Sequence, residues 1–133
     1  MTYLLDTNII TALLRGDERV RDRLQSIVLR GEDVFISGIC YYEIKRGLLA
    51  ANAIKKLSKF EQFCKSFGVL MLDTKSMFNR AAEIYADLKQ RGKLINDADI
   101  LIASSAIEHN LVLVTDDSHF NRIHDIRTEN WLR

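Results

Sequence analysis

Several short apolar segments of the sequence are followed directly by acidic residues. The apolar runs cover residues 3–5, 69–72 and 111–114, and the acids after them are Asp6, Asp73, Asp116 and Asp117. Such runs predict buried strands. Because ligands of an open parallel sheet bind at the carboxyl ends of its strands, we expect these acids to lie along one binding edge.

Two helical segments add acids to the same edge. Glu43 lies in the second turn after a predicted strand, and Asp97 and Asp99 open the helix that precedes another strand. Two positions along a helix correspond to a rotation of about 200°, so Asp97 and Asp99 cannot face one site together. Asp99 is predicted to face inward, because Ile102 and Ala106 lie on its side of the helix.

Each acid also has an ordinary structural interpretation. Asp99 can form an arrangement like a capping box with Asn96, and Asp97 can stabilise the helix dipole. Glu43 can be a solvated acid paired with Lys45 or Arg46. Turn formation or helix capping accounts equally for the remaining acids, which are Asp73, Asp116 and Asp117.

A cluster of these carboxylates would suit a hard divalent cation. Acids held close together repel, and without a counter-ion at least one would be protonated near neutral pH. Mg²⁺ prefers oxygen ligands and keeps several waters, which further carboxylates can hold. A bound ion of this kind activates a water and neutralises developing charge, so the pattern predicts hydrolysis of phosphodiester bonds.

The elements that must position these acids alternate along the chain. Strands are predicted over 2–5, 33–37, 69–72, 111–114 and 126–128, and helices over 8–15, 17–30, 37–51 (with Ser37 as N-cap), 53–67, 75–91 and 96–109. Proline is absent, so Gly, Asn and Asp must set the helix ends. Short strands alternating with helices predict one α/β domain with a mostly parallel sheet of four to five strands.

The composition is that of an ordinary soluble domain. Of 133 residues 47% are apolar and 28% charged, and the net charge of +1 provides no overall basic field. No signal peptide is recognisable, and the apolar runs are too short to span a bilayer, so we expect a cytoplasmic protein without membrane contact. Cys40 and Cys64 lie in apolar helical patterns and are expected to be buried reduced thiols, and zinc is not expected.

Four motifs in order resemble the PIN-domain ribonucleases. They are Leu5-Asp6-Thr7-Asn8, Glu43 after a strand and a small-residue turn, Asp99-Ile-Leu-Ile-Ala-Ser104, and Val114-Thr-Asp-Asp-Ser-His-Phe120. The terminal segment Ile126–Trp131 is similar to the end of the VapC toxins, the ribonuclease half of VapBC toxin–antitoxin pairs. The resemblance spans essentially the whole chain, 1–133, as a single PIN-like domain.

The resemblance implies roles for particular residues. Asp6 and Asp99 match the Mg²⁺-binding acids, with Mn²⁺ a possible substitute, and Glu43 and Asp117 match the second and fourth acids. The spacing of the family motif favours Asp99 over Asp97. Two small polar positions, Asn8 and Thr115, would hydrogen-bond the acids or their waters, and two acids beyond the pattern would lie behind them, namely Asp97 and Asp116.

The resemblance also implies a fold, an activity and partners. The fold would be a three-layer α/β/α sandwich, and the activity that of a Mg²⁺-dependent endoribonuclease toxin acting on tRNA or rRNA. The partners would be a second copy in a homodimer and a VapB-like antitoxin, giving a heterotetramer or a larger complex. Candidate phosphate contacts, each of which is equally explained as part of a solvated face, are Lys45, Arg46, Lys55, Lys56, Lys59, Arg91 and Lys93.

Two other functions compete with this one. A phosphatase using Asp6 as a nucleophile would need a second Asp two residues later, where this chain has Asn8. A catalytically silent PIN-like module that binds RNA or protein is the stronger alternative. The presence of all four acids argues against it.

Overall fold

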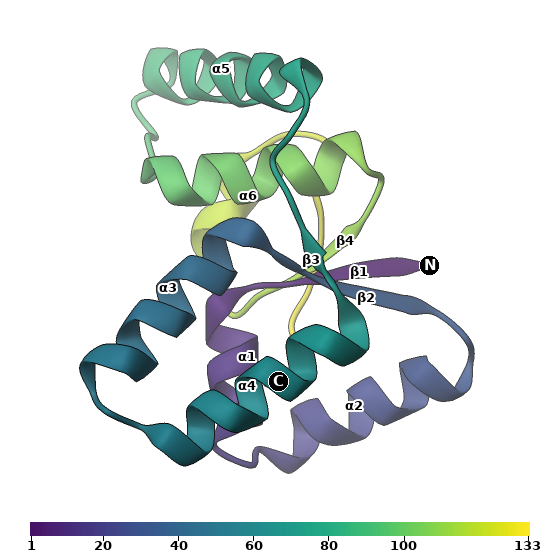
Figure 1. Ribbon diagram of the computed structural model, residues 1–133. Coiled ribbons are helices and arrows are strands. Elements are labelled where there is room, and N and C mark those ends of the chain that lie inside the picture. Colours follow the sequence, from purple (N-terminus) through teal and green to yellow (C-terminus); the bar gives the residue numbers. More distant parts are fainter.

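The computed structural model describes residues 1–133 and contains a five-stranded, all-parallel sheet between layers of helices (Figure 1). The strands follow the order β3-β2-β1-β4-β5. The elements are β1 Thr2–Leu5, α1 Thr7–Leu14, α2 Glu18–Leu29, β2 Asp33–Ser37, α3 Gly38–Ala50, α4 Ile54–Phe67, β3 Val69–Leu70, α5 Lys75–Gln90, α6 Asp97–Glu108, β4 Val112–Val114, the 3₁₀ helix η1 Ser118–Arg122, and β5 Arg127–Glu129. The predicted three-layer α/β/α sandwich is confirmed.

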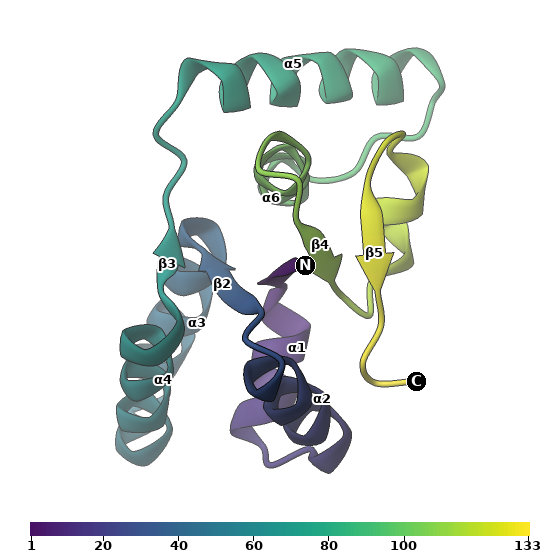
Figure 2. The same ribbon diagram turned by 90° about the vertical axis from the view of Figure 1, so that its right-hand side faces the viewer.

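The helices divide unequally between the two sides of the sheet. Helices α1 to α4 lie on one side, whereas α6 covers the other and α5 packs outside it (Figures 1 and 2). Strand β1 is the centre of the sheet, pairing with β2 and β4. Leu4 and Leu5, which point to opposite faces, are both completely buried. Burial on both faces explains why β1 is a continuous apolar run instead of an alternating one.

Side-chain caps fix the starts of α3 and α6, the two helices that carry Glu43 and Asp99. The Ser37 side chain accepts a hydrogen bond from the backbone N–H of Ile39 at the start of α3, as predicted. Asn96 likewise accepts from the N–H of Asp99 at the start of α6. Each cap satisfies an N–H group that has no partner within its helix.

The third strand differs from its prediction. It covers only Val69 and Leu70, so Asp73 lies three residues beyond its end. The side chain that caps α5 is that of Thr74, which accepts from the N–H of Met77, so the capping role predicted for Asp73 is wrong. Because β3 is an edge strand paired only with β2, fewer backbone bonds hold it than hold the central strands.

Helix α6 is enclosed on several sides, as its nearly uniform apolar pattern predicted. Its buried residues include Ile100, Ile102 and Ala103, and it packs against α5, α3 and β4. Cys40 is buried and Cys64 partly buried, and both are free thiols. None of the helices has the length and apolar character needed to cross a membrane.

Candidate active site

The carboxyl ends of β1 and β4 lie side by side, and the residues that follow them form the centre of the candidate site. The backbone N–H of Asp6 donates to the carbonyl oxygen of Val114 at 2.9 Å, which extends the pairing of the two strands by one residue. Asp6 and Thr115, the residues that follow the two strands, are therefore neighbours although 109 positions separate them. Sheet order alone produces this contact.

The Asp6 carboxylate is held by four donors. Its Oδ2 accepts from the Thr115 hydroxyl at 2.7 Å and from the Asn8 amide at 3.3 Å. Its Oδ1 accepts from the Thr7 N–H at 2.8 Å and from the Cys40 thiol at 3.7 Å. The residue is only 5% exposed, so both oxygens have fixed directions. Asn8 and Thr115, for which hydrogen bonds to the acids were predicted, thus both donate to Asp6.

Burial raises the pKa of the Asp6 carboxyl above its usual value. The hydrogen bonds from Thr115, Thr7 and Cys40 act in the opposite direction because they stabilise the charged form. The nearby charge of Asp117 adds to the increase. A neighbouring cation would remove the conflict between burial and charge.

Glu43 joins the site through Thr7. The Thr7 hydroxyl donates to Oε1 of Glu43 at 3.2 Å, while the Thr7 N–H donates to Asp6. The basic neighbours of Glu43 are engaged elsewhere: Lys45 pairs with Glu61 of α4 at 3.0 Å, and Arg46 lies over the Tyr42 ring. The alternative in which Glu43 pairs with Lys45 or Arg46 is therefore wrong.

Asp99 combines the capping role with a position beside the other acids. The Asp99 carboxylate accepts a hydrogen bond from the side-chain amide of Asn96 at 3.0 Å. The backbone N–H of Asp99 in turn donates to the side-chain oxygen Oδ1 of Asn96 at 2.9 Å. Burial raises the pKa of Asp99 to about 6, and the charges of Asp6, Asp117 and Glu43 contribute in that order. The charges of the other three predicted acids thus all act on Asp99.

Asp117 faces Asp99 across the site. Its N–H donates to the Thr115 hydroxyl at 3.0 Å, so Thr115 connects Asp117 to Asp6. Its Oδ1 accepts from the N–H of His119 at 2.8 Å and lies 3.2 Å from the His119 ring Nδ1. Asp99, Asp117 and His119 each offer one ligand atom, and these three atoms lie within 4.8 Å of one another.

Sequence reasoning missed His119. The signal was present, because Asp117 begins the short 3₁₀ helix η1 and its side chain accepts from the N–H two residues later, a turn that brings the next side chains back toward the cap. His119 remains exposed. It adds a nitrogen donor to the rim of an otherwise oxygen-rich cluster.

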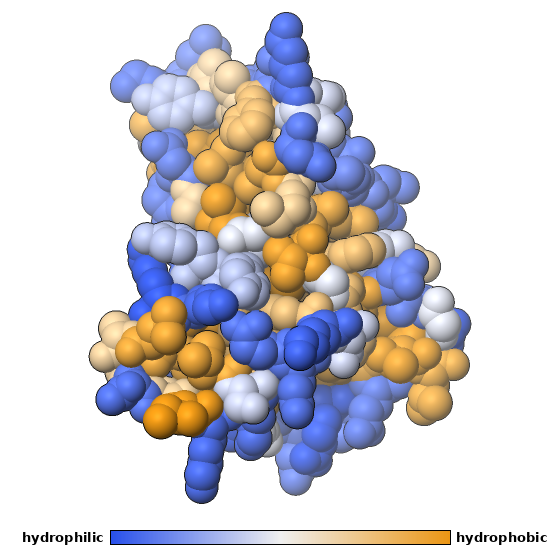
Figure 3. Space-filling model, in the orientation of Figure 1, coloured by the Kyte–Doolittle hydropathy of each residue, from blue (hydrophilic) through white to orange (hydrophobic).

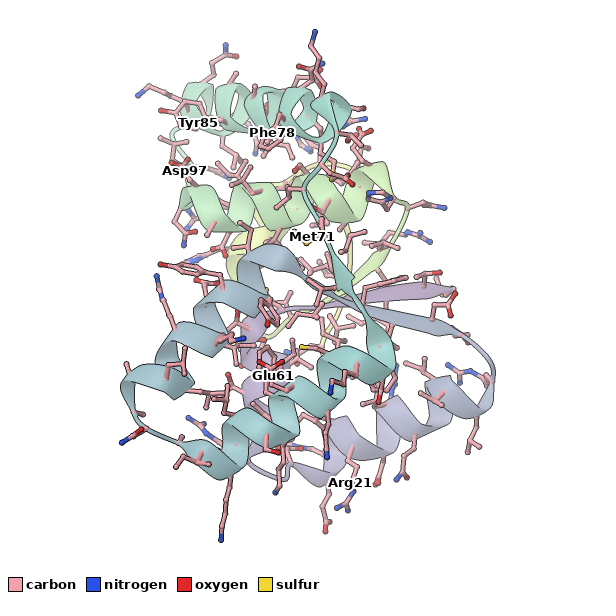
Figure 4. The ribbon with its side chains drawn as sticks, viewed as in Figure 1. Arg21, Glu61, Met71, Phe78, Tyr85 and Asp97 are labelled. Carbon is pink, nitrogen blue, oxygen red and sulfur yellow. The ribbon has the colours of Figure 1, made fainter.

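Asp97 and Asp116 point away from the four acids. Asp97 is exposed and lines a groove between α5 and α6 with Ala81 and Tyr85 (Figure 4). The Asp116 N–H donates to the Asn8 side-chain oxygen at 3.1 Å. Its carboxylate instead accepts from the Asn130 amide at 2.7 Å and lies 3.4 Å from the Arg133 guanidinium.

The donor set fits a hard divalent cation. Asp99, Asp117 and His119 offer ligand atoms within 4.8 Å of one another, and the charges of Asp6 and Glu43 act on Asp99. The pKa values of Asp6 and Asp99 are both raised. Mg²⁺ and Mn²⁺ prefer such oxygen donors. With an ion between them, the acids would hold it and its waters, an arrangement suited to activating water at a phosphate.

The comparisons with known proteins agree with this geometry. The PIN domain family model matches residues 3–126. Ribonuclease VapC2 of Rickettsia felis is 31% identical over 98% of both chains, and the tRNA(fMet)-specific endonuclease VapC of Salmonella typhimurium is 31% identical over 98% of both chains. The solved structure of VapBC2 from Rickettsia felis bound to a promoter DNA fragment superposes with a TM-score of 0.90 at 28% identity, covering 98% of this chain and 99% of that chain.

The match therefore includes the fold, the length and nearly every element that carries an acid. It extends from Tyr3 in β1 to Ile126 just before β5. A parallel sheet with acids at the adjoining ends of β1 and β4 is found together with full-length similarity to named VapC ribonucleases. The chain belongs to the PIN-domain family, among the VapC ribonucleases of toxin–antitoxin pairs.

Proposed function

We propose that this protein is a Mg²⁺-dependent endoribonuclease and the toxin of a VapBC-type pair. The observation that carries the proposal is the effect of the surrounding acids on Asp99, whose pKa is raised to about 6 by burial and by the charges of Asp6, Asp117 and Glu43. In such a cluster the ionised carboxylates repel one another, and a bound cation would remove this repulsion. Substitution of Mg²⁺ by Mn²⁺ is expected.

In the proposed mechanism each acid has a distinct task. Asp6 and Asp99 would hold the ion, and a bound ion would supply a water of lowered pKa and neutralise charge on the phosphate. Glu43, whose nearest polar partner is the Thr7 hydroxyl and not a cation, accepts a proton from the attacking water. Asp117, directed by Thr115 and His119, orients a further water.

The substrate and partners follow from the relatives. One of them is named a tRNA(fMet)-specific endonuclease, and we infer a structured RNA, tRNA or rRNA, as the substrate here. The structure of VapBC2 supports a VapB-like antitoxin as partner, within a homodimer, heterotetramer or larger complex. Such RNA is cytoplasmic, so we assign the activity to the cytoplasm.

An apolar area supports association with another chain. Phe78, Tyr85 and Met71 are exposed apolar side chains close to α6, on a face where apolar residues gather (Figures 3 and 4). Contiguous apolar surface of this kind marks protein interaction sites. We assign it to contacts with a second copy or the antitoxin.

The direct test is cleavage of total cellular RNA by the wild-type protein and by Asp99→Asn, with Mg²⁺, with Mn²⁺ and with a chelator. We expect cleavage by the wild type with either ion, none with the chelator, and none by the variant. Identical products from both proteins would exclude an enzyme acting at this site. Binding without cleavage under every condition would favour the silent RNA- or protein-binding module.

A cellular test addresses the toxin role. Expression of the wild type should arrest growth, and expression of Asp99→Asn should not. Co-expression of the small gene expected beside this one should relieve the arrest. Normal growth with active, soluble wild-type protein would contradict the toxin assignment and leave the nuclease assignment untouched.

A further inference from the structure

A groove leads away from the acids between α1 and α3. One end is formed by Thr7 and Glu43, which belong to the site, and the cavity has a volume of about 230 Å³. Its other end is formed by Arg15, just after α1, and Lys56, in the first turn of α4. Thr7 and Arg15 are separated by roughly 12 Å along α1, at about 1.5 Å per residue.

The two cations at the far end carry charge that nothing in the chain neutralises. No carboxylate lies within 4.0 Å of the charged groups of Arg15 or Lys56, and both residues are exposed. Lys56 lies at the positive end of the α4 dipole, where a cation does not stabilise the helix. Lys56 therefore has no evident role in the fold, whereas Arg15, which is the C-cap of α1, can stabilise that helix while its charge remains without a carboxylate partner.

Gly47 keeps the middle of the groove open. It lies inside α3, one turn after Glu43, where glycine weakens a helix by roughly 1 kcal/mol relative to alanine. A Cβ atom at this position would meet nothing within 4 Å. Internal packing therefore does not require glycine here, and its effect is to leave space for something that approaches α3 from outside.

The cavity on the opposite side of α1 differs in charge. Arg15 also borders it, but its other basic residue, Arg19, pairs with Asp17 at 2.8 Å and donates to the Leu132 carbonyl oxygen. Asp116 adds negative charge to its wall. The acids and bases that line that cavity balance, whereas the bases outnumber the acid Glu43 in the groove between α1 and α3, so an anionic chain would be attracted more strongly to that groove.

We propose that the groove between α1 and α3 binds the RNA strand next to the scissile phosphate, with Arg15 and Lys56 contacting the flanking phosphates and Gly47 giving the strand access to α3. This inference rests on the proposed ribonuclease function and specifies where its substrate lies. Unpaired basic side chains supply the sequence-independent part of RNA affinity, and their contribution decreases as salt increases.

The test uses Arg15→Gln, Lys56→Gln and the double variant, with Lys65→Gln as a control. Lys65 lies in the last turn of the same helix α4, is exposed and does not line the groove. Steady-state cleavage of a fluorescent single-stranded RNA of twelve nucleotides is measured across a salt series. We expect the double variant to raise KM about tenfold at low salt with kcat nearly unchanged, and each single variant to reduce the salt slope by about 1.

A second pair of variants separates groove access from charge. Gly47→Ala should raise the midpoint of thermal unfolding because alanine has a higher helix propensity than glycine. That result would show that the position tolerates a side chain. Gly47→Leu should raise KM for the same RNA without altering the salt slope.

Two outcomes would overturn the inference: unchanged KM in both the double variant and Gly47→Leu, or an equal effect of Lys65→Gln. Failure of the wild type to cleave any RNA would instead refute the ribonuclease proposal, so the two failures are distinguishable.

Discussion

Asp6 and Asp99 belong to one acid cluster but are held in opposite ways. Asp6 accepts four hydrogen bonds and is 5% exposed. Asp99 is only partly buried, and its carboxylate accepts one side-chain hydrogen bond, from Asn96 in its own turn. One acid is fixed by the tertiary structure, and the other is supported by the first turn of its own helix.

The comparison indicates a division of labour. Asp6 has its direction before any ion arrives, because donors from three segments of the chain surround it. Asp99 faces three other acids with little to stabilise its charge, and its pKa is correspondingly raised to about 6. A cation would therefore find a preformed ligand in Asp6 and would have to displace a proton from Asp99 in mildly acidic solution.

The largest expected effect is that of Asp6→Asn. Removing the fixed charge should weaken Mg²⁺ binding and cleavage by more than about 100-fold, the upper end of what loss of a group behind a metal ligand causes. The fold should remain, since asparagine keeps one acceptor oxygen and the same shape. Calorimetric titration with Mg²⁺ measures the effect, with circular dichroism as the control for folding. An unchanged affinity would remove Asp6 from the ligand set.

Thr115→Val tests whether the fixed direction of Asp6 matters. The change removes the donor to Asp6 and the acceptor for the Asp117 N–H while conserving volume. We expect Mg²⁺ affinity to fall by about 10- to 100-fold. Thr115→Ser, which keeps the hydroxyl, is the matched control and should stay close to wild type. Equal losses in both variants would point to packing instead of hydrogen bonding.

The pH dependence of the metal-free protein tests the other half of the comparison. Because the pKa of Asp99 is raised to about 6 in the folded state, the folded protein binds more protons than the unfolded chain between about pH 4 and 6. The contribution of Asp99 to stability is therefore present at low pH and is lost as pH rises through about 6. Urea unfolding in chelator should show this loss in the wild type, and Asp99→Asn should reduce it. Parallel pH profiles for the two proteins would show that Asp99 carries no such shift.

Cys40→Ala should have the smallest effect on the site. The thiol is a weak donor at 3.7 Å from Asp6, and three stronger donors remain. We expect less than about a threefold change in Mg²⁺ affinity and a loss of about 1 kcal/mol in the free energy of unfolding from the buried cavity. A change in Mg²⁺ affinity comparable to that of Thr115→Val would show that the thiol helps to direct Asp6.

The sequence by itself determined the local features. Apolar runs identified the strands, and the caps Ser37 and Asn96 were recognisable because capping depends on residues only two or three positions apart. The rotation between helical positions two apart showed that Asp97 and Asp99 cannot face one site together, and the resemblance to the family motif favoured Asp99. The position of the acids at strand ends also followed from pattern and topology alone.

Only the tertiary structure decided which distant groups meet. The strand order β2-β1-β4 brings Thr115 into hydrogen-bonding distance of Asp6, 109 positions away in the sequence. Lys45 forms an ion pair with Glu61 of another helix, so Glu43 has no basic partner. In the C-terminal segment, the Asn130 amide donates a hydrogen bond to the Asp116 carboxylate. These pairings depend on sheet order and helix packing, which arise from the burial of the whole core, and no local spacing in the sequence encodes them.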